Sequence, residues 1–434
     1  MNSGSRPREV LFITGANPLR GGGGLETYVR AHALAARTAG FAAHIFCVAR
    51  QTRVSSTAIG VVHEVAVPPH YIHGSLARLY SPRLERALRE HIGPDPTQPV
   101  LIHAFGPYGC VGARLARTLR RRSVESVLVT SVYNTQEADH RSVLAGWRRE
   151  QGARNAVRYL ARYTTARAIG TRYERAGYEG SRLLLVNYES VRELLLAQFD
   201  EGWEIRTMPY TSDAAFLKEP GGADCAHSDA AASASHAALL EPRGAPLLVC
   251  VSRHDARKGV DVLLRALGQL RAAGVPFRAC LLGRGELIMA HRRLAARLGL
   301  ERCVAITGQV PDVRPYLRSA DVFVLPSLSE SSGSVSLLEA LQEGLAIVAS
   351  RCDGVPEDVT DGDSALLVPV GDQQALAGAI AALLRDPPLR RRLGARAREL
   401  FKARFSAERF TASLAELYAE LGVTPNASSV SVCS

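Results

Sequence analysis

Two basic side chains, Arg253 and Lys258, stand where the chain could bind an anion. Both belong to the segment VSRHDARKGVDVLL, in which an apolar run passes through a short loop into a helical pattern. The first backbone N–H groups of a helix point at such a loop, and with a guanidinium and an ammonium group they can bind a diphosphate. A solvated basic loop is the alternative for Arg253, because arginine is abundant here. Lysine occurs only three times in the chain, so Lys258 favours the phosphate interpretation.

Two carboxylates, Glu330 and Glu339, lie in a second segment with the pattern strand, loop, helix, strand. Apolar runs at 322–325 and 345–349 are typical of buried parallel strands, and a helical pattern at 335–343 separates them. Ligands of such βαβ units bind where the strand end opens into the loop and the start of the helix. Glu330 lies in that loop and Glu339 on the helix among leucines. The alternatives are a solvated loop carboxylate for Glu330 and a helix surface residue for Glu339.

The elements that must position these residues alternate between strands and helices along most of the chain. Such alternation is typical of doubly wound parallel sheets, and 434 residues are too many for one core. We therefore predict an α/β fold with two doubly wound, Rossmann-like domains that face each other across a cleft. The predicted parts are an N-terminal domain at 1–217 joined by a C-terminal helix at 405–422, a flexible linker or insert at 218–245, a second domain at 246–404 and a disordered tail at 423–434.

Composition limits the classes of protein to consider. Hydrophobic residues make up 47% and charged residues 22%, as in soluble globular proteins. No apolar run approaches the roughly 20 residues that span a bilayer, and the N-terminus lacks the apolar segment of a signal peptide, so we expect a cytoplasmic protein. The eight cysteines are scattered without a C-x-x-C pair, which argues against a disulfide or zinc framework. The net charge of +11 favours anionic partners, but nucleic-acid binding would rest on charge alone and is not predicted.

Four segments occur in an order that resembles the C-terminal half of a known enzyme family. They are VSRHDARKGVDVLL, LLGRGE at 281–286, the region of Glu330 and Glu339, and CDGVPEDVTDGDSALLVPVGD at 352–372. Together they resemble the retaining GT-B glycosyltransferases of family 4, the glycosyl transferases group 1. A glycine run at 21–24 followed by Leu-Glu-Thr resembles the loop that opens the N-terminal domain of that family. The resemblance covers nearly the whole chain and rests on more motifs in the second half.

The resemblance implies the residues of a donor site. Arg253 and Lys258 would bind the donor diphosphate, and Glu339 would hold the ribose hydroxyls. Glu330 would contact the transferred sugar, but the two glutamates are nine positions apart where the family motif has eight, so Ser331 is the alternative. We favour Glu330, because a loop absorbs one extra residue at small cost. Further donor contacts are implied in the glycine-rich loops and at the start of the helix, namely Gly22, Gly23, Gly283, Gly333, Ser334 and Val335.

The acceptor side departs further from the family pattern. Where the family often carries His-x-His at a strand end, only His103 is present here, with Phe105 in the second place. A later His-Asp pair of the family corresponds to Tyr133 and Asn134. We predict His103, Tyr133 and Asn134 as acceptor-side residues. A hydrogen-bonded core histidine is an equal alternative for His103.

The resemblance implies a retaining transfer of a sugar from a nucleotide diphosphate sugar to a hydroxyl acceptor on a glycan, a lipid-linked molecule or a small molecule. It also implies a front-face reaction in which the leaving-group oxygen takes the acceptor proton, with no protein nucleophile, no metal and no cofactor beyond the donor substrate. The sequence Asp-Gly-Asp at 361–363 resembles the metal motif of other transferases, but before a strand it is more typical of a turn. Two alternatives stay open: a sugar-nucleotide epimerase on the same fold, and a relative that binds a nucleotide or a partner without catalysis.

Two arginine runs, at 120–122 and 390–392, bear on membrane contact. Such runs are most often solvated faces of helices. Their charge also suits an anionic membrane, so we add the hypothesis of peripheral contact with the inner face of the cytoplasmic membrane.

Overall fold

The chain forms two compact units, which the computed structural model describes over residues 8–20, 23–67, 77–93, 99–145, 147, 153–199, 202–212, 244–330 and 333–425. The first unit contains residues 1–140, 161–216 and 405–434, and the second contains residues 141–160 and 217–404. The predicted linker at 218–245 lies outside the described residues except for 244 and 245, and the predicted tail at 423–434 lies outside them from 426 on. Gly22 and Ser331 lie outside them as well. Val423, the first residue of the predicted tail, is instead buried in the core of the first unit.

The first unit is built on a sheet with eight strands among the described residues, in the order β3-β4-β2-β1-β5-β6-β7-β8. These strands are β1 (Glu9–Thr14), β2 (Ala42–Ala49), β3 (Arg53–Thr57), β4 (Gly60–Ala66), β5 (Val100–Phe105), β6 (Ser126–Val132), β7 (Leu183–Val186) and β8 (Ile205–Thr207). Neighbouring strands pair in parallel except at the β3–β4 edge, which is antiparallel. Every residue of β5 is buried, as expected for a strand covered on both faces.

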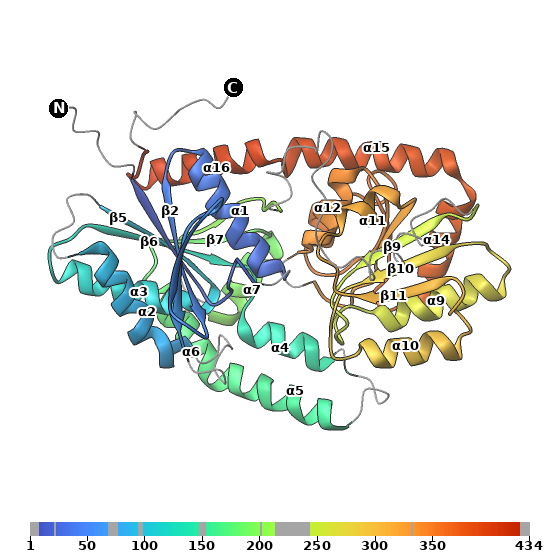
Figure 1. Ribbon diagram of the computed structural model, residues 1–434, viewed down its shortest axis with the longest axis horizontal. Coiled ribbons are helices and arrows are strands. Elements are labelled where there is room, and N and C mark those ends of the chain that lie inside the picture. Colours follow the sequence, from blue (N-terminus) through green and yellow to red (C-terminus); the bar gives the residue numbers. More distant parts are fainter. Residues whose placement is uncertain are drawn as a thin grey trace. The chain divides into compact units, whose positions relative to one another are not determined.

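Helices cover both faces of this sheet (Figure 1). On one face, α1 (Gly24–Thr38) and α16 (Ala407–Glu420) contribute Val29 and Leu414 to a core that includes Phe12. On the other, α2 (Ala77–Ile92) and α3 (Gly109–Arg120) contribute Leu88 and Leu115 to a core around Leu11. Further helices of this unit are α6 (Thr171–Tyr178) and α7 (Glu189–Phe199). Before them come α4 (Gln136–Ala145) and α5 (Ala153–Thr165), parts of which group with the second unit, and a π-helical segment (Ala166–Gly170) between α5 and α6.

The second unit has a parallel sheet with six strands among the described residues, in the order β11-β10-β9-β12-β13-β14. They are β9 (Leu247–Val251), β10 (Arg278–Leu282), β11 (Val304–Gly308), β12 (Val322–Leu325), β13 (Ala346–Ser350) and β14 (Leu366–Val368). The helices are α9 (Val260–Ala272), α10 (Ile288–Arg297), α11 (Arg314–Ser319), α12 (Val335–Glu343), α13 (Val355–Asp358), α14 (Gln373–Arg385) and α15 (Pro387–Arg404). The strand order reverses beside β9, so the loops after β9 and β12 meet at the topological switch point, where such sheets bind ligands.

The predicted α/β class with two Rossmann-like sheets is confirmed, but one boundary differs. Residues 141–160, which we expected in the N-terminal domain, group with the second unit. Tyr159 on α5 is buried in a small cluster with Ala256 and Leu287, and its hydroxyl donates to Glu286. These partners come far later in the chain, so the local pattern of α5 carries no sign of them.

Candidate functional site

The structure brings together two of the predicted site residues, Lys258 and Glu330, at the switch point of the second sheet. Lys258 follows β9 and Glu330 follows β12, and Lys258 Nζ donates to Glu330 Oε2 at 2.7 Å. The two side chains are 15% and 2% exposed. The Ser327 hydroxyl donates to the other carboxylate oxygen of Glu330. Both oxygens are therefore engaged and hold the carboxylate in one orientation, while an ammonium group has three donors and uses one here.

Gly259 makes this pairing possible. It precedes α9 with a φ of 58°, in the left-handed region, and a Cβ there would overlap the carbonyl oxygen of Pro326. The two loops also bond through their backbones, since Leu328 N donates to Arg257 O at 2.6 Å. Sequence reasoning missed Gly259, although a lysine-glycine pair directly before a helical pattern was an available signal.

The loop after β13 completes the arrangement through Asp353. Its Oδ2 accepts from the Glu330 backbone N–H and from the Ser329 hydroxyl, both at 2.7 Å. Asp353 has a φ of 43°, a conformation that aspartate tolerates better than most residues. Loops after three adjacent strands, β9, β12 and β13, therefore fix Glu330. Sequence reasoning quoted this segment but did not single out Asp353, for which the Asp-Gly pair after a strand was the signal.

Two cysteines close to Glu330 remain neutral thiols. Burial raises the pKa of Cys250 to about 12 and holds the pKa of Cys352 well above its ordinary value. The negative charge of Glu330 raises both values further. The thiolate is the nucleophilic form, so neither cysteine is a candidate nucleophile at neutral pH.

Arg253 lies in the same loop as Lys258 but has an exposed guanidinium. Its side chain is 57% exposed, and its Nη2 lies 2.9 Å from Asp255 Oδ2. A surface ion pair contributes little, so this guanidinium can exchange its partner for a ligand phosphate at small cost. Gly283, a predicted donor contact after β10, has a φ of 134°, and a Cβ there would overlap the Ser252 carbonyl oxygen. The close approach of two loops therefore already requires glycine at 283, without any ligand.

The predicted donor contacts around α12 lie at and just after its N-terminus. Ser334 is the N-cap, and its Oγ accepts from Leu337 N at 3.4 Å. Gly333 before it has a φ of 94°, which disfavours any other residue. Val335 is the first residue of the helix, and Glu339 lies about one turn further along, half-buried. The positive end of the helix dipole at this point suits an anionic or hydroxyl-bearing ligand.

In the first unit, Gly23 is the N-cap of α1 and has an extended backbone with φ −87° and ψ 163°. Its carbonyl accepts from Thr27 N at 3.2 Å. The three atoms nearest to a Cβ at this position all belong to the Glu26 carboxylate, the movable end of a side chain. The fold itself therefore does not require glycine here, and close approach of a ligand stays a prediction.

His103 is buried in the core of the first unit. Its ring is 0% exposed, with Nδ1 at 2.7 Å from Tyr418 Oη and Nε2 at 2.7 Å from Ser131 Oγ. Burial lowers the pKa of His103 well below its ordinary value. A neutral imidazole with both nitrogens bonded inside the unit cannot take a proton from a ligand in this conformation. The structure therefore favours the alternative of a hydrogen-bonded core histidine.

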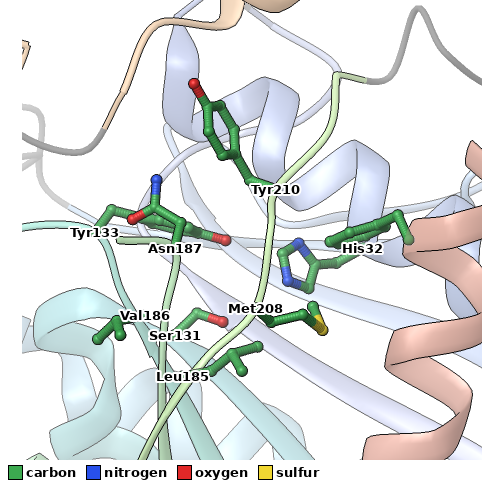
Figure 2. Close-up of a pocket in the computed structure, with 9 residues that line it drawn as sticks. His32, Ser131, Tyr133, Leu185, Val186, Asn187, Met208 and Tyr210 are labelled. Carbon is green, nitrogen blue, oxygen red and sulfur yellow. The ribbon is translucent and has the colours of Figure 1, made fainter. Parts of the chain in front are cut away.

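Tyr133 lines a small pocket of the first unit (Figure 2). The lining residues are His32, Ser131, Tyr133, Leu185, Val186, Asn187, Met208, Tyr210 and Phe410. The Tyr133 ring stacks on Tyr28 with 4.3 Å between centroids, and burial raises the pKa of its hydroxyl above the ordinary value. Asn134 accepts from Thr135 N at 2.9 Å, a local turn contact. Sequence reasoning missed the residues that α1 and the segments after β7 and β8 contribute, because no local motif marks them.

The architecture of the whole chain defines a fold class. Sucrose-phosphate synthase from Thermosynechococcus elongatus has the same fold, with a TM-score of 0.74 at 22% sequence identity, over 96% of this chain and 99% of that chain. Two Rossmann-like units with these strand orders are those of the GT-B fold. The predicted fold is confirmed at that level.

One segment of the second unit matches a known family. Residues 245–386 match the family of glycosyl transferases group 1, so this segment carries a domain of that family. A lipopolysaccharide core biosynthesis glycosyltransferase of Rhizobium meliloti is 34% identical over 183 residues, 42% of this chain and 52% of the relative. A GDP-mannose-dependent alpha-(1-6)-phosphatidylinositol monomannoside mannosyltransferase of Mycolicibacterium smegmatis is 34% identical over 150 residues, 33% of this chain and 39% of the relative. The matches span about half or less of these relatives' length.

Proposed function

We propose that this protein is a retaining glycosyltransferase of family 4 that moves a sugar from a nucleotide diphosphate sugar to a hydroxyl acceptor. The observation that carries the proposal is the Lys258–Glu330 pair at the switch point of the second sheet. It lies within the segment that matches the glycosyl transferases group 1. The relatives of that segment are named as glycosyltransferases, which supports the same reaction class.

In this proposal the donor lies along the loops after β9 and β12. Arg253, Lys258 and the first N–H groups of α9 neutralise the diphosphate, and Glu339 holds the ribose hydroxyls. Glu330 reaches the transferred sugar, since Lys258, Ser327 and Asp353 hold it in place. Lys258 keeps donors for the diphosphate while it remains bonded to Glu330. Gly333, Ser334 and Val335 line the donor, whereas Gly283 shapes the loop.

The reaction proposed is a front-face transfer in which the sugar–phosphate bond breaks as the acceptor oxygen bonds the anomeric carbon from the same face. The leaving diphosphate oxygen takes the acceptor proton, so configuration is retained and no protein nucleophile is needed. The positive charges of Arg253 and Lys258 stabilise the negative charge that develops on the leaving group. Neither a metal nor a cofactor is assigned a step in this transfer.

The acceptor is proposed to be a hydroxyl of a glycan, a lipid-linked molecule or a small molecule. The relatives named above act in lipopolysaccharide core biosynthesis and on a phosphatidylinositol mannoside, which favours a lipid-linked acceptor. No helix among the described residues is long and apolar enough to cross a membrane. We propose a cytoplasmic enzyme with peripheral contact to the inner membrane face through Arg120, Arg121 and Arg122, which are exposed. The second arginine run is less suited, because Arg390 donates to the Leu383 carbonyl at 2.6 Å.

The first experiment tests the donor site. A panel of nucleotide diphosphate sugars, including GDP-mannose, is incubated with the protein and a panel of glycan and lipid acceptors, and both transfer and release of the nucleoside diphosphate are measured. We expect Lys258→Ala and Arg253→Ala to lower kcat/KM by about 100-fold or more, because each loses a charge on the leaving group. The matched control is Lys402→Ala, which removes an exposed lysine of α15. A loss within a few-fold of wild type in both site variants would contradict the assignment.

The same experiment separates the alternatives. An epimerase would convert the donor sugar without an acceptor and without release of the nucleoside diphosphate. A binding protein would give a thermal shift with a donor and no product. Retention of configuration is read from the anomeric coupling constant of the product by NMR.

A further inference from the structure

Three histidines from separate segments gather on one face of the first sheet. His44 lies on β2, His63 on β4 and His91 in the last turn of α2. One possible ligand atom from each lies within 4.8 Å of the other two. Among the described residues, this is the only group of three histidine, cysteine or acidic side chains with that geometry. The proposed sugar transfer uses none of these residues.

The fold places the three rings together for identifiable reasons. In the parallel β2–β4 pair, His44 lies opposite Val61 and Phe46 opposite His63, so the two histidines are diagonal neighbours on one face. The Phe46 ring stacks on His63 with 4.2 Å between centroids and fixes the plane of that ring. α2 packs over β2 and β4 and brings the His91 ring to 4.2 Å from the His44 ring. The cluster is thus held by a sheet register and a packed helix.

The ring nitrogens are already oriented toward each other. His44 Nδ1 lies 3.1 Å from His63 Nε2. Two imidazole nitrogens bound to one tetrahedral ion at 2.0–2.1 Å are about 3.4 Å apart, so this pair needs only a small adjustment. The rings are half-buried, which leaves a path for a small ion.

A carboxylate supports the cluster from outside. Glu9, the first residue of β1, has its Oε2 at 2.9 Å from His91 Nε2 and its Oε1 at 3.9 Å from His44 Nε2. Metal-binding histidines commonly donate their second N–H to a carboxylate, which fixes the tautomer and orients the ring. Glu9 therefore leaves His44 Nδ1 and the other nitrogen of His91 available as ligands.

We propose that His44, His63 and His91 form a binding site for a divalent transition-metal ion, of the Zn²⁺ class, with Glu9 as the outer carboxylate. Imidazole nitrogen is a preferred ligand of Zn²⁺, and Mg²⁺ or Ca²⁺ would require oxygen ligands instead. Three protein ligands leave one position for water or a further ligand. The ion would tie the end of α2 to β2 and β4.

The test uses untagged protein, because a histidine tag binds the same ions. After treatment with a chelator, the protein is titrated with Zn²⁺ in competition with a chromophoric chelator, and with Co²⁺ in a visible absorption measurement. We expect one Zn²⁺ per chain with submicromolar affinity, the absorption of tetrahedral Co²⁺, and a higher Tm with Zn²⁺ than with Mg²⁺.

Variants identify the ligands. His63→Ala and His91→Gln are expected to weaken Zn²⁺ binding by more than 100-fold, and Glu9→Gln by about 10–100-fold, the usual cost of losing an outer carboxylate. His91 lies in the last turn of α2, so His91→Gln can be checked for an unchanged circular dichroism spectrum. His140→Gln, which removes a histidine outside the cluster, is expected to bind as wild type does. Micromolar or weaker binding to the wild type, or binding that survives both ligand variants, would overturn the proposal and leave a packed histidine cluster.

Discussion

The Lys258–Glu330 pair of the second unit is held differently from two buried polar groups of the first unit, His103 and Glu174. In the second, Glu330 is paired with Lys258, and the same loop presents the exposed Arg253. In the first, His103 is enclosed between Tyr418 and Ser131. Glu174 of α6 is also 0% exposed there, and its Oε1 accepts from the Gln136 backbone N–H at 2.8 Å. Among the described residues, no basic side chain forms an ion pair with it.

This difference indicates which buried groups serve a ligand. A buried ion pair adds little to stability relative to apolar residues, and losing one partner leaves the other charge uncompensated. We therefore expect a pair of that kind, beside an exposed guanidinium and a helix N-terminus, to have a role in ligand binding. We expect groups that are neutral and fully buried, such as His103, to have a role in packing.

The largest expected effect separates the two buried glutamates. Glu330→Gln removes the charge that pairs with Lys258, and we expect kcat/KM for sugar transfer to fall by about 100-fold. Glu174→Gln is the control with the same substitution at a buried position of the first unit, and it should leave the rate within a few-fold of wild type. Equal losses in the two variants would show that the effect of Glu330→Gln is not specific to the candidate site.

The second-largest effect is expected for Gly259→Ala. A Cβ at this position is forced into the Pro326 carbonyl oxygen and into a left-handed backbone, so we expect a loss of about 3 kcal/mol in unfolding free energy together with weaker donor binding. Gly362→Ala is the control, because its φ is 73° but no atom lies within 4 Å of the added Cβ. Urea denaturation measures both, and a similar cost for the two variants would show that backbone strain alone matters at Gly259.

The pH dependence of the unfolding free energy tests whether Glu174, a buried carboxyl without an ion pair among the described residues, has a raised pKa. Burial raises the pKa of Glu174 to about 8 from an ordinary value of 4.5. A raised folded-state pKa gives stability that is complete below pH 4.5 and lost as the pH rises through about 8. The unfolding free energy of Glu174→Gln should therefore equal that of the wild type near pH 4.5 and exceed it by roughly 2 kcal/mol at pH 8. This difference stays below the upper limit, which is about 1.4 kcal/mol for each unit by which the pKa is raised.

Each unit carries one tryptophan for this measurement, Trp203 in the first and Trp147 in the second. Trp203 lies 5.5 Å from the Tyr178 ring and reports on the surroundings of Glu174. The urea series is therefore run in a Trp147→Phe background. Identical pH profiles for wild type and Glu174→Gln would show that Glu174 ionises normally.

The smallest effect concerns His103. Tyr418→Phe removes the hydroxyl at Nδ1 and leaves a buried polar nitrogen without that partner, at a cost of about 1 kcal/mol in unfolding free energy. Transfer to the acceptor should keep its kcat and its KM. A changed KM for the acceptor with unchanged stability would return His103 to the acceptor site.

Sequence reasoning singled out Lys258 and Glu330, which the structure brings together, because their signals are local. Lys258 and Glu330 each follow a buried strand and precede a helix, and parallel strands place such loops at one edge of the sheet. Gly259 and Asp353 escaped it because their roles depend on contacts between loops. The grouping of residues 141–160 with the second unit was missed for the same reason.

The histidines show most clearly what could not be predicted from the sequence. His103 reads as a strand-end histidine, and only its distances to Ser131 and Tyr418 place it in the core. His44, His63 and His91 have no motif spacing, because the sheet register and α2 bring them together. A scan for cysteine pairs could not find such a group.

The C-terminal helix has a consequence for how the protein is made. α16 supplies Leu414 and Tyr418 to the core of the first unit, yet it follows every strand of the second unit in the chain. During synthesis the second unit leaves the ribosome complete while the first still lacks one helix over its sheet. Domains usually fold in order from the N-terminus. Here the unit that is translated first must finish folding last, and until α16 emerges its uncovered apolar face is the surface that a chaperone would have to protect.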